Sequence, residues 1–155
     1  MAQQLWLLRH GEAEPHDSAT DVDRKLTARG RDQSRAAGRT LAALGVGFQM
    51  AFTSPKVRAR DTAELACEAL GLEPVDHEPL SAGFDRDDAL ELMAAAGGNR
   101  RVLVVGHEPD FSQVVHDLTG ARVDLKKGGV AAVRLDGTSA ELIVVMRPRE
   151  LDRIR

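Results

Sequence analysis

The sequence predicts an α/β fold, a three-layer αβα arrangement with helices on both faces of a mainly parallel central sheet. Segments with strand character and segments with helical spacing alternate along most of the chain, which is typical of α/β proteins. Residues 5–8 and 102–105 are continuous apolar runs, as expected for strands that are buried on both faces. Two apolar segments flank Asp136-Gly137, a hairpin-type turn, so we expect an antiparallel strand near the C-terminal end.

Length and composition limit the possible classes of protein. The 155 residues are expected to form one domain, residues 1–155, with 43% hydrophobic and 29% charged residues. A formal net charge of -3 and few aromatic residues argue against nucleic-acid binding. No segment is long enough to cross a bilayer and no signal peptide is evident. Because Cys67 is the single cysteine, we expect a cytoplasmic protein with no membrane partner.

The first predicted strand ends abruptly in polar residues, Arg9-His10-Gly11. In an open α/β sheet, ligands bind at the carboxyl ends of the strands. Arg9 offers a cationic fork that suits phosphate or carboxylate, and His10 offers a nitrogen for nucleophilic or acid–base chemistry. Gly11 has no Cβ, so the backbone can turn sharply there and a ligand can approach closely.

The first helix is predicted to begin at Thr27, a suitable N-cap, and to stop at Gly45. Residues 14–25, which precede this helix, are polar and are the one candidate for a mobile loop. Whether this loop closes over the site does not follow from the sequence. Apolar residues recur in the helix at helical spacing, at Ala37, Leu41 and Leu44. Residues 50–53 are a second strand, broken by Ser54-Pro55 at the start of another helix.

The second helix is predicted to end at Gly71. The remaining predicted elements are an edge strand at 74–77, a helix at 87–96, a buried strand at 102–105, a helix containing residues 111–118, and strands at 130–135 and 141–146. The tail from Arg147 is polar and basic, and no element is predicted there.

Basic residues follow the ends of three predicted strands. The first strand leads to Arg9 and His10, the second leads through Ser54-Pro55 to Arg58, and the third leads to His107. If these strands are parallel neighbours, their ends share one crevice. A cluster of two arginines and two histidines is costly unless an anion fills it, and a phosphoryl group is the natural guest.

These motifs resemble those of the histidine phosphatase, or phosphoglycerate mutase-like, superfamily. The resemblance is carried by Arg9-His10-Gly11, Ser54-Pro55-Lys56-Val57-Arg58 and Gly106-His107, in this order. Together with the short chain, Leu26-Thr27-x-x-Gly30 and Val105-Gly106-His107-Glu108-Pro109 are most similar to the SixA-type phosphohistidine phosphatases. The resemblance covers residues from about 5 to at least 127.

The resemblance implies an enzyme that forms a covalent phosphohistidine at His10, which water then hydrolyses. Arg9, Arg58 and His107 would complete the phosphate pocket, and Gly11 would help to bind the substrate. No metal and no cofactor would be required. Zinc sites need ligands clustered at short spacings, and arginines beside the histidines would repel a cation.

Larger members of the superfamily supply a carboxylate as general acid for an alcohol leaving group. The candidates here are Glu12, Glu78 and Asp85, and the sequence does not choose among them; Glu78 lies in the expected stretch, before Pro79-Leu80. An imidazole is a far less basic leaving group than an alkoxide and needs less help from an acid. The short segment 71–101 also leaves no room for a cap over the site.

The favoured substrate is therefore phosphohistidine on a protein partner, such as a phosphotransfer domain. Two alternatives remain open: a small phosphomonoesterase of the same superfamily, and a noncatalytic module that binds phosphoproteins. The identity of the partner, the pathway and the oligomeric state do not follow from the sequence.

Several other polar residues are predicted to lie outside the chemistry. Arg60 is expected to be structural, Cys67 packed and inert, and Asp21 and Asp23 solvated loop charges. Lys126-Lys127 is either a solvated loop or part of the pocket rim. The remaining histidines are expected to take no part in the chemistry: His16, His77 and His116. Of these, His16 lies in a loop near the site and is the one that could influence it.

Overall fold

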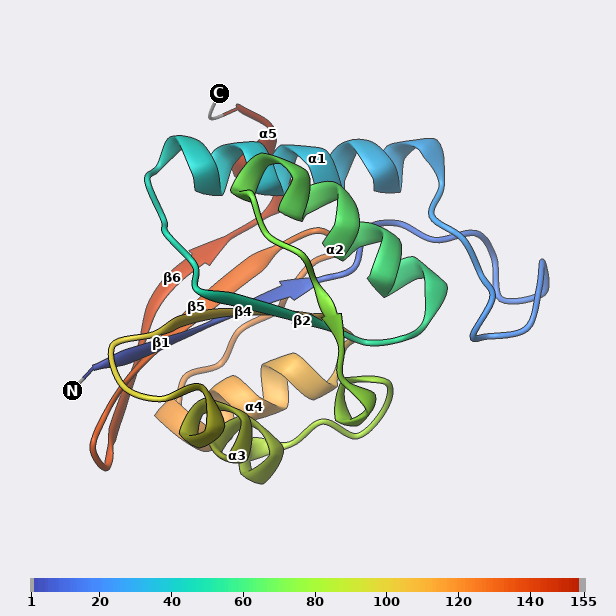
Figure 1. Cartoon of the computed structure of the whole chain (residues 1–155). Coiled ribbons are helices and arrows are strands. Elements are labelled where there is room, and N and C mark those ends of the chain that lie inside the picture. Colours follow the sequence, from blue (N-terminus) through green and yellow to red (C-terminus); the bar gives the residue numbers. More distant parts are fainter. Residues whose placement is uncertain (1, 154–155) are drawn as a thin grey trace.

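The computed structural model describes residues 2–153, and its centre is a six-stranded sheet (Figure 1). The strands lie in the order β3-β2-β4-β1-β5-β6. Their bounds are β1 Gln3–Arg9, β2 Met50–Thr53, β3 Val75–Asp76, β4 Arg101–Gly106, β5 Val130–Asp136 and β6 Ser139–Met146. The helices are α1 Ala28–Ala43, α2 Val57–Leu70, α3 Arg86–Ala96, α4 Asp110–Thr119 and α5 Pro148–Arg153, with a 3₁₀ turn, η1, at Glu78–Leu80.

Strands β3, β2, β4 and β1 pair in parallel. Strand β5 is antiparallel to both of its neighbours, β1 and β6. The predicted mainly parallel sheet with an antiparallel strand near the C-terminal end is therefore confirmed. Because β1 and β4 are parallel neighbours in register from Gln4↔Arg101 to Arg9↔Gly106, the segments that follow them begin side by side.

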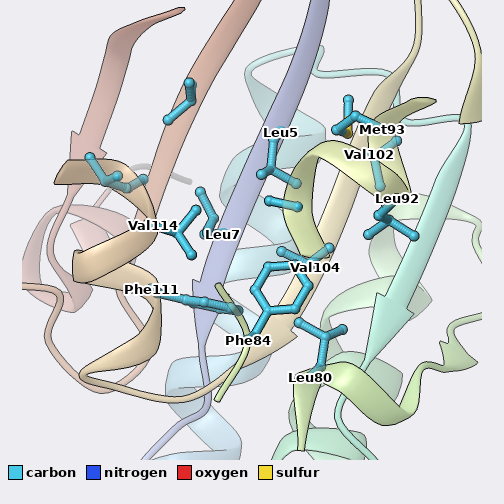
Figure 2. Packing of buried hydrophobic residues seen from close by; sticks show 14 of the residues in the cluster. Leu5, Leu7, Leu80, Phe84, Leu92, Met93, Val102, Val104, Phe111 and Val114 are labelled. Atoms are coloured by element: carbon cyan, nitrogen blue, oxygen red, sulfur yellow. The ribbon is translucent and has the colours of Figure 1, made fainter. Parts of the chain in front are cut away.

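Helices cover both faces of the sheet, which confirms the three-layer prediction (Figure 1). Alternate side chains of β1 enter opposite cores, because successive residues of a strand point to opposite faces. Leu5 and Leu7 join the core beneath α3 and α4. Figure 2 shows this core, which also contains Phe84 and Phe111. Trp6 and Leu8 join the core beneath α1, α2 and α5. Burial on both faces explains why this strand is apolar throughout.

The ends of the helices follow local sequence signals. The Thr27 side chain caps α1 by accepting a hydrogen bond from the Gly30 backbone N–H at 3.0 Å. Gly71 ends α2 in the left-handed conformation, with a φ of 68°. Asp85 and Asp88 form a capping box at the start of α3, which begins one residue before the predicted start.

One element is missing from the sequence-based prediction. The polar, basic tail forms helix α5, which packs against α1. Leu151 is buried in the core on that side of the sheet, and its carbonyl oxygen accepts a hydrogen bond from the Thr40 hydroxyl at 2.5 Å. The six residues of α5 show no recognisable helical pattern, because Leu151 is the one residue of this helix that is buried.

Within residues 2–153, no helix is both long enough and apolar enough to span a membrane.

Candidate functional site

His10 and His107 meet at the carboxyl edge of the sheet. His10 follows β1 and His107 follows β4, and the centres of their rings lie 5.2 Å apart. The His10 backbone N–H donates to the Gly106 carbonyl oxygen at 3.0 Å, which extends the pairing of the two strands by one residue. The exposed fractions are 7% for His10 and 8% for His107. The parallel register of β1 and β4 thus fixes both rings.

Hydrogen bonds leave each ring with a defined orientation. Nδ1 of His10 lies 2.7 Å from the Gly11 carbonyl oxygen, a pure acceptor, so Nδ1 carries the proton and Nε2 the lone pair. Nε2 of His107 lies 2.8 Å from the Ser54 hydroxyl oxygen. That oxygen already accepts from the Lys56 backbone N–H at 3.2 Å, so the hydroxyl proton is available to His107 Nε2.

The pKa of His10 is lowered from 6.5 to about 4, mainly by burial; the hydrogen bond to Gly11 opposes this shift, and the positive charges of Arg58 and Arg9 add to it. Burial also lowers the pKa of His107 to about 3, with His10 and Arg58 as smaller causes. Both rings are therefore neutral at pH 7 while the pocket holds no anion. A neutral imidazole retains the lone pair that nucleophilic attack requires.

Two arginines flank the histidines. Arg9 ends β1, and its Nη1 donates to the Leu125 carbonyl oxygen at 2.9 Å. Arg58 lies in the first turn of α2 and is buried, with both Nη atoms bonded to Asp21. Burial lowers the pKa of Arg58 against the opposing charge of Asp21, and its guanidinium remains charged. Among residues 2–153, the buried Nε atoms of both arginines have no hydrogen-bond partner.

These four residues share a pocket of about 440 Å³. It is lined by residues from the ends of β1, β2 and β4 and from three loops: Arg9, His10, Ala13, His16, Asp21, Arg24, Lys56, Arg58, Ser81, Ala82, Gly83, His107, Glu108, Asp110 and Lys127. Five of these side chains are arginine or lysine, so the pocket is suited to an anion.

Comparison with known proteins gives the family. The sequence profile of the histidine phosphatase superfamily (branch 1) matches residues 5–81. A 2,3-bisphosphoglycerate-dependent phosphoglycerate mutase of Mesorhizobium japonicum is 31% identical over 94% of this chain and 81% of the mutase. The chain belongs to the histidine phosphatase superfamily. It is a phosphatase-type enzyme of this superfamily, as the sequence motifs predicted.

Two further relatives match this superfamily member over nearly their full length. An uncharacterized protein of Picosynechococcus sp. is 32% identical over 96% of this chain and 98% of its own. The structure of the protein histidine phosphatase SixA complexed with tungstate is 28% identical, covers 96% of this chain and 99% of SixA, and superposes with a TM-score of 0.87. By contrast, the chain spans about half the length of several curated mutases that it matches.

The loop before α1 brings charges to the pocket that sequence analysis did not assign to it. Asp21, predicted to be a solvated loop charge, pairs with Arg24, Lys56 and Arg58. The side chain of Asp21 is 53% exposed, as predicted, but the prediction missed these ion pairs, which form because the loop folds back onto the start of α2. Asp23 is exposed and accepts a hydrogen bond from the Thr20 hydroxyl. No local pattern distinguishes these two aspartates, since the partners of Asp21 are mostly distant in the sequence.

Gly11 is not among the residues that line the pocket. Its backbone N–H donates to the Thr62 hydroxyl at 3.1 Å, and a Cβ on Gly11 would lie 2.4 Å from the Gly30 carbonyl oxygen. Close packing against the start of α1 therefore requires a glycine at this position. Its carbonyl oxygen still orients the ring of His10.

None of the predicted general acids lines the pocket. Glu78 is exposed at the start of η1 and accepts a hydrogen bond from the Ser81 hydroxyl. Asp85 caps α3, and Glu12 accepts a hydrogen bond from Thr27. These placements give no support to an acid role for Glu78. The carboxylates that do line the pocket are Asp21, Glu108 and Asp110.

Of the other residues considered in the sequence analysis, some line the pocket and the others lie outside it. His16 and Lys127 line the pocket, whereas Lys126 pairs with Asp124 outside it. His116 is exposed on α4, and His77 packs against Phe52. Cys67 is buried, and burial raises the pKa of its thiol to about 12, so the thiol is protonated at neutral pH.

Within residues 2–153, no group of three or more histidine, cysteine, aspartate or glutamate side chains is placed to hold a metal ion.

Proposed function

We propose that this phosphatase forms a phosphohistidine at His10 and removes the phosphoryl group from phosphohistidine on a protein. The observation that carries the proposal is the His10–His107 pair, with ring centres 5.2 Å apart beside buried arginine Nε atoms that lack partners. A buried unpaired donor costs free energy, and a bound phosphoryl oxygen would satisfy it.

His10 is the nucleophile. The bond from its Nδ1–H to the Gly11 carbonyl oxygen leaves the Nε2 lone pair for attack on phosphorus. The lowered pKa keeps the ring neutral at physiological pH. As an N–P bond forms at His10 Nε2, the bond between phosphorus and the substrate nitrogen breaks. The substrate ring, which carries a proton on its other nitrogen, keeps the electron pair and leaves as a neutral imidazole. Water then attacks phosphorus, His10 departs neutral, and phosphate is released.

Arg9, Arg58 and His107 bind the transferring group. Guanidinium donors match the oxygens of a phosphoryl group, and they are most effective in a site from which water is excluded. Arg58 is only 5% exposed, so it acts in such an environment. His107 has its Nε2 beside the Ser54 hydroxyl, which leaves the Nδ1 proton to donate to phosphoryl oxygen.

Three observations favour phosphohistidine as the substrate. None of the predicted general acids lines the pocket, and the three carboxylates that do are held by other groups: Asp21 by three cations, Glu108 by Ser112 and Asp110 by the Gly83 backbone N–H. An imidazole leaving group needs little assistance from an acid. The short connections β3, η1 and α3 carry no inserted cap, so a side chain of another protein can reach the site. The match to SixA, described as a protein histidine phosphatase, covers nearly both chains. A phosphotransfer domain is one partner of this chemistry.

The test is intact-mass measurement after brief mixing with a phosphohistidine-bearing protein, quenched in alkali. We expect one added phosphoryl group on the enzyme that is stable in alkali, is lost in acid and is absent from His10→Ala. We expect His10→Ala to slow turnover by roughly 10³-fold or more. His116→Ala, an exposed histidine on α4, is the matched control and should retain full activity.

The mutase relationship supplies one competing function, a phosphomonoesterase. Rapid turnover of a small phosphate ester, with the phosphohistidine protein unchanged, would replace the proposed substrate with an ester and keep His10 as nucleophile. Binding of the phosphoprotein with neither turnover nor an adduct would identify a noncatalytic binding module instead.

A further inference from the structure

The loop of residues 14–25 is docked onto the pocket by its backbone. Its two ends pair with each other, since the Glu14 N–H donates to the Lys25 carbonyl oxygen at 2.8 Å. Near its middle, the Val57 N–H at the start of α2 donates to the Val22 carbonyl oxygen at 3.0 Å. The loop therefore closes over the side of the pocket that Arg58 occupies, and the residue beside Val22 enters the pocket.

That residue, Asp21, contacts three cations at once. Its Oδ1 accepts from Arg24 Nη2 at 3.1 Å and from Arg58 Nη2 at 3.2 Å. Its Oδ2 lies 2.9 Å from Lys56 Nζ, and its backbone carbonyl oxygen accepts from Arg58 Nη1 at 2.6 Å. The hydrogen bonds from Lys56 and Arg24 hold the pKa of Asp21 well below its usual range, so the carboxylate is ionised.

The contacts of Asp21 with Arg24 and Arg58 do not involve the Nε atom of either guanidinium group. Arg24 is 7% exposed and Arg58 is 5% exposed, yet the Nε atom of each has no hydrogen-bond partner within residues 2–153. Asp21 engages only the Nη atoms. The two Nε atoms are thus buried donors that Asp21 leaves without a partner, and a phosphoryl oxygen that reached them would supply one.

We propose that Asp21 is a positioning residue of the phosphoryl pocket, through which the 14–25 loop holds Arg24, Lys56 and Arg58 in place for phosphoryl binding. The inference rests on the proposed phosphoryl pocket and extends it to the loop. Three cations that share a small volume repel one another, and one carboxylate at their centre offsets that repulsion without filling the Nε edges. Positioning of this kind fixes the geometry before the substrate arrives.

The test is the affinity for tungstate, an oxyanion probe, measured by isothermal titration calorimetry, which requires no turnover. We expect Asp21→Ala to weaken tungstate binding by roughly 10- to 100-fold, because the cations lose their fixed geometry. Asp21→Asn keeps a hydrogen-bond acceptor without the charge and should fall in between. The matched control is Asp23→Ala, in the same loop but outside the cation cluster, which should bind tungstate like the wild type.

Tungstate binding by Asp21→Ala that equals or exceeds wild-type binding would overturn the inference, because a carboxylate that merely occupies the anion site would give this result. The side chain of Asp21 is 53% exposed, so the variant is expected to fold.

A second measurement separates positioning from a general structural role. In an Arg58→Ala background, the Asp21→Ala change should weaken tungstate binding by a smaller factor than in the wild type, because part of its effect passes through Arg58. Equal factors in the two backgrounds would contradict the inference. Neither result depends on which phosphorylated compound is the substrate, so failure of the proposed function would be visible separately, in the adduct experiment with His10.

Discussion

The two sides of the pocket are held in place in different ways. On one side, His10 and His107 follow two parallel strands whose central residues are buried, and backbone hydrogen bonds such as His10 N–H to the Gly106 carbonyl oxygen fix their positions. On the other side, Arg24 and Arg58 are held by Asp21 of a surface loop, through polar contacts. The proposed nucleophile is therefore fixed by the packed core, whereas two of the arginines at the pocket are fixed by the charge of Asp21.

This difference predicts how each side responds to change. Contacts between charges respond to bound anions and to salt, whereas strand pairing over a packed core does not. We therefore expect salt to affect the side that holds Arg24 and Arg58 more than the side that holds His10 and His107.

After the loss expected for His10→Ala, the next largest effect is expected at Arg58, on the side of the pocket held by charges. Arg58→Ala should lower kcat/KM by roughly 10²- to 10³-fold, because it removes a buried donor from the transferring phosphoryl group. Steady-state kinetics would measure this loss. Arg60→Ala is the control on the same helix, since Arg60 pairs with Asp76 near the surface, and its kcat/KM should stay within about twofold. A smaller loss of kcat/KM for Arg58→Ala than for Asp21→Ala would contradict the proposal that Asp21 acts through Arg58.

The rigid side can be tested through the contact between Gly11 and Gly30. A Cβ at Gly11 would lie 2.4 Å from the Gly30 carbonyl oxygen, so we expect Gly11→Ala to lower the free energy of unfolding by roughly 1–3 kcal/mol. Gly47→Ala is the matched control, because a Cβ at Gly47 would meet no atom within 4 Å. Urea denaturation would measure both variants. Equal stability of the two would show that the turn after β1 relaxes freely.

The smallest effect concerns pH. In the unfolded chain both active-site histidines take up a proton below about pH 6.5, but burial lowers the pKa of His10 to about 4 and of His107 to about 3. The contribution of the two neutral rings to the free energy of unfolding is therefore fully present above about pH 6.5, and it is lost as the pH falls toward about 3.

Between about pH 6.5 and about pH 5.5, each histidine should lower the free energy of unfolding by on the order of 1 kcal/mol. Urea denaturation in buffers free of oxyanions would measure it. His107→Asn should reduce the slope, while His116→Gln, at an exposed site, should leave it unchanged. A flat profile in the wild type would mean that the two rings are not buried in neutral form.

Much of the fold could be predicted because its signals are local. The apolar runs of β1 and β4, the Thr27 cap and the Gly71 stop each depend on a few adjacent residues. The joint location of His10 and His107 also followed, since parallel neighbouring strands end at the same edge. Helix α5 did not follow, because Leu151 alone carries its burial.

The sequence by itself therefore determined the order of strands and helices and which histidines and arginines reach the strand ends, because hydrophobic periodicity and helix caps act over a few residues. Only the tertiary structure decided that Asp21 belongs to the pocket and Asp23 does not, that Gly11 serves packing against Gly30, and that Glu78 lies outside the pocket. Each of those outcomes depends on contacts between segments that are far apart in the chain. Such contacts exist only after the sheet and its helices have closed, and no local pattern encodes them.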